Sequence, residues 1–374
     1  MNISNYRVIN IVLIFFLIGY ILPLFLYHIN FLQFGFFVDT YFEFIHKDHS
    51  FNFVDSNLKY LFVCLAAVLG IYSVSFYKIR EPYRISRIKV LKERSLVYID
   101  YLILVMLSVT GFIRIYYTIG HSQFQSTLQY SGVIHYFSTS FLYLIFLYRC
   151  VYNLKKIYFF LGASIIFITE SLLLWRGFAL TLAILFILIF WKSISKSLLL
   201  ILFVLLFILY SALSNFRNTS VNSDSSVSSG ISTITTVLNR FQGFTRAFIV
   251  VNSDMRYDFS NNDAAIRQID TIIWGLNPDI KNSIGGASLG LSFFYGGIIS
   301  VFFYFHLVTL MFIILNSFSK NSIVFKSIFY FVFAQINIIL IEGVSLIYFF
   351  VLLLSCFFLF SFHAFFSKRR ILNL

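Results

Sequence analysis

Charged residues within apolar segments are the first candidates for chemistry in this chain. Five of them lie at or near the ends of long apolar stretches: Arg114, Glu170, Arg176, Arg217 and Glu342. A charge in the hydrocarbon core of a bilayer is costly, so a charged side chain that is kept there commonly has a function. Arginine binds phosphate oxygens through paired hydrogen bonds, and a carboxylate can accept the proton of an attacking hydroxyl group. These residue types favour a transfer reaction on a phosphate-bearing substrate.

A second group of candidates lies in the long polar segment 215–286. The segment opens with a run rich in Asn, Ser, Thr and Asp and continues with apolar residues at helical spacing over 231–248. We expect this helix to lie along the outer membrane surface or to cap a helix bundle. Arg240 and Arg246 flank its apolar face. They would bind either a substrate diphosphate or the phosphates of outer-leaflet lipids.

Sequence signals for metal and nucleotide chemistry are missing. The cysteines Cys64, Cys150 and Cys356 lie in or beside apolar segments, and none has a neighbour at metal-ligand spacing. The chain has no glycine-rich nucleotide loop and no Asp-x-Asp pair for a metal-bound nucleotide sugar. We therefore expect neither a metal nor a cofactor.

The composition predicts an all-α polytopic membrane protein, with residues 1–374 forming a single integral membrane domain. Hydrophobic residues make up 59% of the 374 residues and charged residues 11%, whereas soluble domains contain about 25% charged residues. Continuous rather than alternating apolar segments argue against a β-barrel. About ten segments are long enough to be spans. They lie near 9–28, 60–77, 98–117, 133–152, 157–175, 177–192, 197–214, 287–315, 327–342 and 345–366.

The charges between these spans predict their orientation. The net charge is +13, which we interpret in terms of membrane topology rather than nucleic-acid binding. With the N- and C-termini in the cytoplasm, 18 basic and 3 acidic residues fall inside, against 10 basic and 12 acidic residues outside. This distribution follows the positive-inside rule. It puts the segment 215–286 outside the cytoplasm, and it places all five charged candidates at a similar depth near the outer surface.

Each candidate also has a structural interpretation. Arg114 would then extend its guanidinium to the membrane interface. Glu170 and Arg176, six residues apart, would form an ion pair, and Glu342 would be an exposed turn residue. His306, on an apolar span, is expected to be a hydrogen-bonded core residue rather than a base.

Several motifs resemble those of the Wzy-type polymerases of O-antigen and capsule repeat units. Trp175-Arg176-Gly177 stands before an apolar span, and a large outer segment follows with Phe216-Arg217 and Asn239-Arg240. The stretch from Ser288 to Ile299 is similar to the family's pattern of aromatic residues and glycine that opens the next span. One departure is Tyr295-Gly296-Gly297, where the family commonly has Phe-Gly before the second glycine.

The resemblance implies a GT-C-like architecture and a glycosyl transfer at the outer side of a bacterial inner membrane. The substrates would be undecaprenyl-diphosphate-linked oligosaccharides, which lie among the membrane lipids. A flippase and a chain-length regulator would be partners. Arg176, Arg217, Arg240, Arg246 and Arg114 would bind the diphosphates, with Arg176 also catalytic. Glu170 or Glu342 would be the base.

Other functions remain open from the sequence. A lipid-linked oligosaccharide flippase or another transporter would also be polytopic and basic, but it would need polar residues near the membrane midplane. An O-antigen ligase would be expected to carry a histidine in the outer segment, and 215–286 has none. A membrane acyltransferase and a non-enzymatic receptor or assembly factor are further alternatives.

Overall fold

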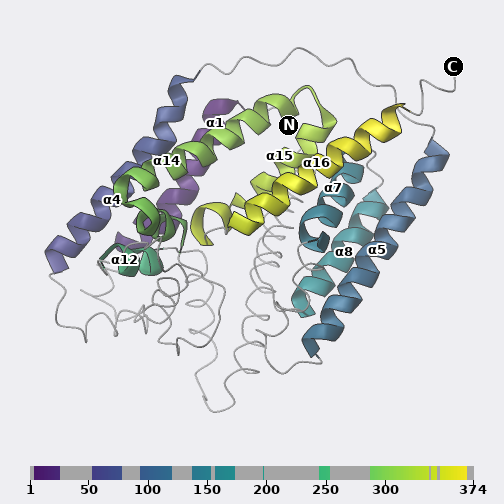
Figure 1. The fold of residues 1–374 in the computed structure, drawn as a ribbon, viewed down its shortest axis with the longest axis horizontal. Helices are drawn as coiled ribbons and strands as arrows, with labels where there is room; N and C mark the ends of the chain where they lie inside the picture. The colour runs from purple at the N-terminus through teal and green to yellow at the C-terminus, as the bar shows by residue number, and fades with distance from the viewer. Residues whose placement is uncertain are drawn as a thin grey trace.

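The computed structural model describes ten stretches of the chain, and these contain helices and no strands. The described residues are 4–25, 53–77, 93–119, 137–152, 156–172, 197, 244–252, 287–336, 338–342 and 346–368. Nine α-helices and four short 3₁₀ or π-helical turns make up the described part, and Figure 1 shows their arrangement. The all-α prediction is confirmed for these residues.

The helices are linked in places by short 3₁₀ or π-helical turns. The α-helices are α1 (Asn5–Phe16), α4 (Phe53–Ser73), α5 (Glu93–Ile119), α7 (Tyr143–Tyr152), α8 (Lys156–Leu172), α12 (Phe244–Asn252), α14 (Ser288–Ser319), α15 (Ile323–Ala334) and α16 (Leu346–Lys368). The π-turns are η1 (Leu17–Ile21), η3 (Phe137–Leu142) and η4 (Ile338–Glu342), and the 3₁₀ turn is η2 (Val74–Phe76). Pro23 lies two residues after the end of η1 and offers no N–H to the Gly19 carbonyl, which accounts for the widened turn.

Four helices are long and apolar enough to cross a membrane: Asn5–Phe25, Asp55–Phe76, Val97–Tyr116 and Ser288–Ser319. Four shorter apolar helices are Ser140–Val151, Phe160–Glu170, Ile323–Ala334 and Val351–Ala364. These eight coincide with eight of the predicted spans. The predicted spans 177–192 and 197–214 lie outside the described residues, apart from Ser197.

The directions of the helices follow from contacts between their ends. Asn5 at the start of α1 accepts a hydrogen bond from Asn316 near the end of α14 (2.9 Å), so α1 and α14 are antiparallel. On α5 and α7, Asp100 pairs with Arg149 and Arg114 lies beside Tyr143, so these two helices are antiparallel as well. α14 and α15 are also antiparallel, because Phe312 contacts Phe333 and Phe318 contacts Phe325. Which side of the bundle faces the cytoplasm remains a prediction.

α14 is not one continuous helix. Gly296 and Gly297 have non-helical backbone angles, and Gly297 has φ +63°, a conformation that glycine adopts without steric penalty. The 22 residues that follow the break, 298–319, are about 33 Å long and can cross a bilayer alone. Residues 288–295 form a separate short helix, so the predicted span 287–315 merges two elements.

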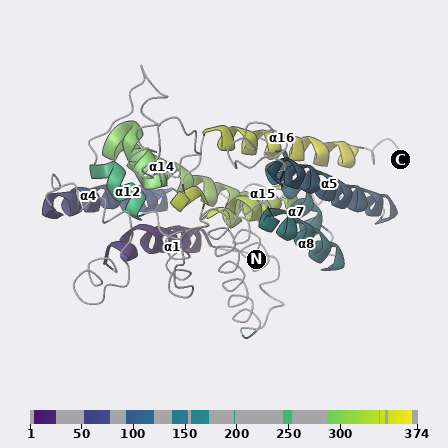
Figure 2. The same cartoon turned by 90° about the horizontal axis from the view of Figure 1, so that it is seen from below.

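α12 covers one end of the bundle beside this short helix. Ala247, Val250 and Val251 are buried, and the Phe248 ring packs against Tyr60 of α4 with a centroid distance of 5.5 Å. Gly290 lies against the α12 backbone, because a Cβ placed there would be 3.0 Å from the Cα of Ala247. Figure 2 shows α12 next to α14 and α4, away from α5, α7 and α8. α12 therefore overlaps the predicted helix 231–248 over 244–248, and 231–243 lie outside the described residues.

Candidate functional site

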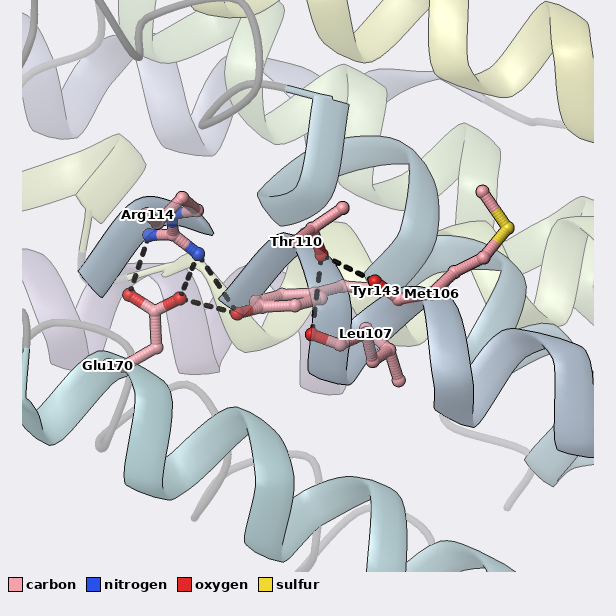
Figure 3. A network of polar contacts seen from close by, with 6 residues as sticks. All are labelled: Met106, Leu107, Thr110, Arg114, Tyr143 and Glu170. Carbon is pink, nitrogen blue, oxygen red and sulfur yellow. Dashed lines mark hydrogen bonds and ion pairs between the residues drawn. The ribbon is translucent and has the colours of Figure 1, made fainter. Parts of the chain in front are cut away.

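Arg114, Glu170 and Tyr143 form a buried polar cluster where three helices meet. The Arg114 guanidinium donates to both carboxylate oxygens of Glu170, at 2.7 Å and 3.3 Å. The Tyr143 hydroxyl donates to Glu170 Oε1 and lies 3.5 Å from Arg114 Nη1. Figure 3 shows the three side chains converging from α5, α7 and α8. The structure thus brings together two of the five charged residues that the sequence predicts at a similar depth.

Small residues let α5 and α8 approach closely enough to form this ion pair. Gly111 lies one turn before Arg114, and a Cβ there would be 2.5 Å from Thr169 Oγ1. Thr169 precedes Glu170, so the glycine contact and the ion pair belong to the same crossing of α5 and α8. Small residues commonly allow such close helix packing in membranes. Thr110 donates back to the Met106 carbonyl within α5 (2.7 Å) and takes no part in the pair.

The cluster is closed off from solvent, and its charges compensate each other. The side chains of Arg114 and Glu170 are each 2% exposed, so neither charge would be stable there without the other. Glu170 uses both carboxylate oxygens in these bonds and is poorly placed to accept a proton from a substrate. Its partner in the described part of the chain is Arg114 on a different helix, and Arg176 lies outside the described residues.

A second polar junction lies where the start of α14 meets η4. Ser288 and Tyr304 of α14 donate to the Ile339 carbonyl, at 2.6 Å and 2.7 Å. Tyr20 of η1 donates to the Leu340 carbonyl at 2.7 Å. The Tyr20 hydroxyl also accepts from the backbone N–H of Leu289 (3.3 Å). These hydroxyls satisfy backbone groups at two helix ends that are buried in the protein.

The remaining predicted site residues are only partly described. Arg176, Arg217 and Arg240 lie outside the described residues. The backbone of Arg246 lies in the first turn of α12, and that of Glu342 is the last residue of η4. The structure thus brings Arg114 and Glu170 together and places the Glu342 backbone at a different junction.

A second ion pair, in which Arg149 is buried and Asp100 is 16% exposed, was not predicted. Arg149 near the end of α7 donates from Nε to Asp100 of α5 at 2.7 Å and from Nη2 at 3.2 Å. In the predicted topology both residues contribute only to the number of charges on the cytoplasmic side. The sequence held a usable signal, because opposite charges near the same predicted end of adjacent spans are expected to meet.

His306 has a hydrogen-bond partner, as predicted. Its Nδ1 lies 2.6 Å from the Ser73 hydroxyl, and that hydroxyl donates its proton to the Gly70 carbonyl at 2.7 Å. The Ser73–His306 contact joins α4 to α14.

Within the described part of the chain, no group of three or more His, Cys, Asp or Glu side chains could hold a metal ion. Comparison with known proteins adds no assignment: no protein-family model, no curated protein and no solved structure matches this chain. The functional proposal therefore depends on the residues themselves and on their geometry.

Proposed function

We propose that this protein polymerises undecaprenyl-diphosphate-linked oligosaccharide repeat units at the outer side of the bacterial inner membrane. The proposal includes ten membrane spans with cytoplasmic termini, a GT-C-like architecture and an outer segment at 215–286. The observation that carries it is the buried Arg114–Glu170–Tyr143 cluster. An arginine held in a fixed position near the end of its membrane helix is suited to a lipid diphosphate, because the diphosphate of such a lipid lies at the membrane surface.

The reaction would be a single glycosyl transfer. A hydroxyl of the acceptor's non-reducing sugar attacks the anomeric carbon of the donor glycan. The bond from that carbon to the diphosphate oxygen breaks, and undecaprenyl diphosphate leaves with the electron pair. Arginines would stabilise the negative charge that develops on the leaving group. The proton of the attacking hydroxyl would pass to a carboxylate.

The cluster favours Glu342 over Glu170 as that carboxylate. Glu170 accepts hydrogen bonds from Arg114 and Tyr143 through both of its oxygens, so we assign it the role of holding Arg114. Glu342 is the only acidic residue after Asp279. In this proposal Arg176, Arg217, Arg240 and Arg246 complete the binding of the donor and acceptor diphosphates.

One observation favours a different class, a lipid-linked oligosaccharide flippase. α14 is broken at Gly296–Gly297, and interrupted helices are common in transporters, where they form the substrate site. Against this, the ion pairs Asp100–Arg149 and Arg114–Glu170 lie towards opposite ends of α5. A transport site is expected near the middle of the membrane.

Gene deletion tests these functions against each other. Surface glycan from the deletion strain would be resolved as a ladder on a gel, with the wild-type gene on a plasmid as control. A polymerase predicts that long chains collapse to one repeat unit on the usual acceptor, because synthesis, flipping and ligation continue. Loss of the single capped unit as well would refute polymerisation and support a flippase or a ligase.

A further inference from the structure

Three hydroxyl groups hold the short π-turn η4 from outside its own helix. Ser288 and Tyr304 donate to the carbonyl of Ile339, and Tyr20 donates to that of Leu340 with a longer contact to Ile341 (3.2 Å). These donors are 51, 35 and 320 residues away from their acceptors in sequence. Three successive carbonyls of η4 therefore receive hydrogen bonds from other elements.

These bonds give partners to carbonyls that are buried in the protein. Ile339, Leu340 and Ile341 are at most 1% exposed, and a buried carbonyl without a hydrogen-bond donor is costly, above all in a membrane protein. Each of the three carbonyls receives a hydroxyl donor from another element.

Tyr20 also connects η4 to the start of α14. Its hydroxyl accepts from the Leu289 N–H while it donates to the Leu340 carbonyl. Leu289 is in the first turn of α14, whose preceding residue Ala287 has no side chain that could cap the helix. One buried hydroxyl thus joins the beginning of one helix to the end of another, and a shift in either would break the junction.

We propose that Tyr20, Ser288 and Tyr304 are positioning residues for Glu342, which is the last residue of η4. This inference rests on the proposed function, in which Glu342 is the general base. A base must be held close to its productive position, and an error of about 1 Å can lower the rate a hundredfold. The three hydroxyls fix the backbone of the turn that carries Glu342, so they act through Glu342 and do not touch the substrate.

The test uses the purified full-length protein in lipid nanodiscs, with lipid-linked repeat units extracted from the deletion strain as substrate. Ser288→Ala and Tyr304→Phe remove one donor each, and Ser288→Thr restores a hydroxyl. Ser292→Ala is the matched control, because Ser292 donates within α14 to the Ser288 carbonyl and does not reach η4. All variants are first compared with wild type for membrane level and melting temperature.

We expect Ser288→Ala and Tyr304→Phe to lower kcat about tenfold or more while KM stays within about twofold, as for an interaction that acts in the transition state. Ser288→Thr should recover most of the loss, and Ser292→Ala should match wild type. In the Glu342→Gln background the hydroxyl variants should cause little further loss, because their effect passes through the missing carboxylate.

Three results would overturn the inference. Equal losses with and without the Glu342 carboxylate would show a purely structural role. Unchanged kcat in Ser288→Ala and Tyr304→Phe would show that catalysis needs neither donor to η4. If Glu342→Gln has no measurable activity, the kcat values of these two single variants against wild type decide the inference. Full activity of Glu342→Gln would show that Glu342 is not the base, so the hydroxyls could not act by positioning it. The proposed polymerisation would still stand. Failure of the wild-type protein to form polymer would instead refute the proposed function, and the inference with it.

Discussion

Separating the Arg114–Glu170 pair tests both the energetics and the role of the cluster. Glu170→Gln keeps the size of the side chain but leaves the Arg114 charge uncompensated at 2% exposure. Breaking a buried ion pair by removing one partner costs about 3–5 kcal/mol. Hydrogen bonds between membrane helices are worth only about 0.6 kcal/mol on average, so the unpaired charge dominates the expected loss. We therefore predict a destabilisation of about 3 kcal/mol.

Removing both charges should have a much smaller effect. A buried ion pair replaced by apolar residues of similar volume is often as stable as the original pair. The double variant Arg114→Met with Glu170→Leu should therefore lie within about 1 kcal/mol of wild type. Thr110→Val is the matched control on the same helix, since the Thr110 hydroxyl bonds only to carbonyls of α5.

The assay is equilibrium unfolding of the purified full-length protein in detergent micelles, combined with the glycan ladder in cells. A destabilisation below about 1 kcal/mol in Glu170→Gln would refute the argument that this pair is buried and mutually dependent. The ladder separates structure from function in the double variant. A stable protein that makes no long chains supports a role of Arg114 in diphosphate binding. A stable protein with a normal ladder would show that the pair is structural only.

Three further predictions concern the proposed diphosphate site and two glycines of the described helices. Arg176→Ala and Arg217→Ala should each abolish long chains while the protein stays in the membrane at its normal level; unchanged ladders in both would contradict their assignment to the diphosphates. Gly111→Val should destabilise the protein by about 1–3 kcal/mol in the unfolding assay, because the new side chain meets Thr169 and separates α5 from α8. Gly297→Ala should cost about 1 kcal/mol despite open space around it, because of its φ of +63°; a neutral result would mean that the break adapts without strain.

For the described residues, the sequence was sufficient to predict an all-helical chain with long apolar helices. Continuous apolar runs identify spans without knowledge of their neighbours, and loop charges order them. It was not sufficient to predict the break in α14. Gly296 and Gly297 lie in an otherwise unbroken apolar stretch, and glycine is common in membrane helices. Only the backbone angles show that the helix ends there.

The sequence predicted that Arg114 and Glu170 lie at a similar depth, but it did not predict that they pair with each other. Topology placed Arg114 and Glu170 near the same surface, and they do meet. The expected Glu170–Arg176 pair was inferred from closeness in the sequence. The observed Arg114–Glu170 pair depends instead on which helices are neighbours in space. Tyr20 illustrates the same limit: its bond to Leu340 spans 320 residues, and no periodicity in the sequence links the two.

The two ion pairs of α5 also indicate where the membrane surfaces lie. Asp100 and Arg114 are fourteen positions apart, which is about 21 Å along a helix. On the exposed side of α5, Tyr98 and Tyr101 lie near the first pair and Tyr116 near the second, and tyrosines gather at membrane–water interfaces. The exposed residues between them are mostly apolar: Leu102, Val105, Met106, Val109 and Phe112. We therefore expect both pairs to lie near the edges of the hydrocarbon region, where a charge costs less than at its centre. The Arg114 level is then the depth at which the diphosphate of a lipid-linked substrate would sit, whereas a site for carrying that substrate across would require polar groups between the two levels.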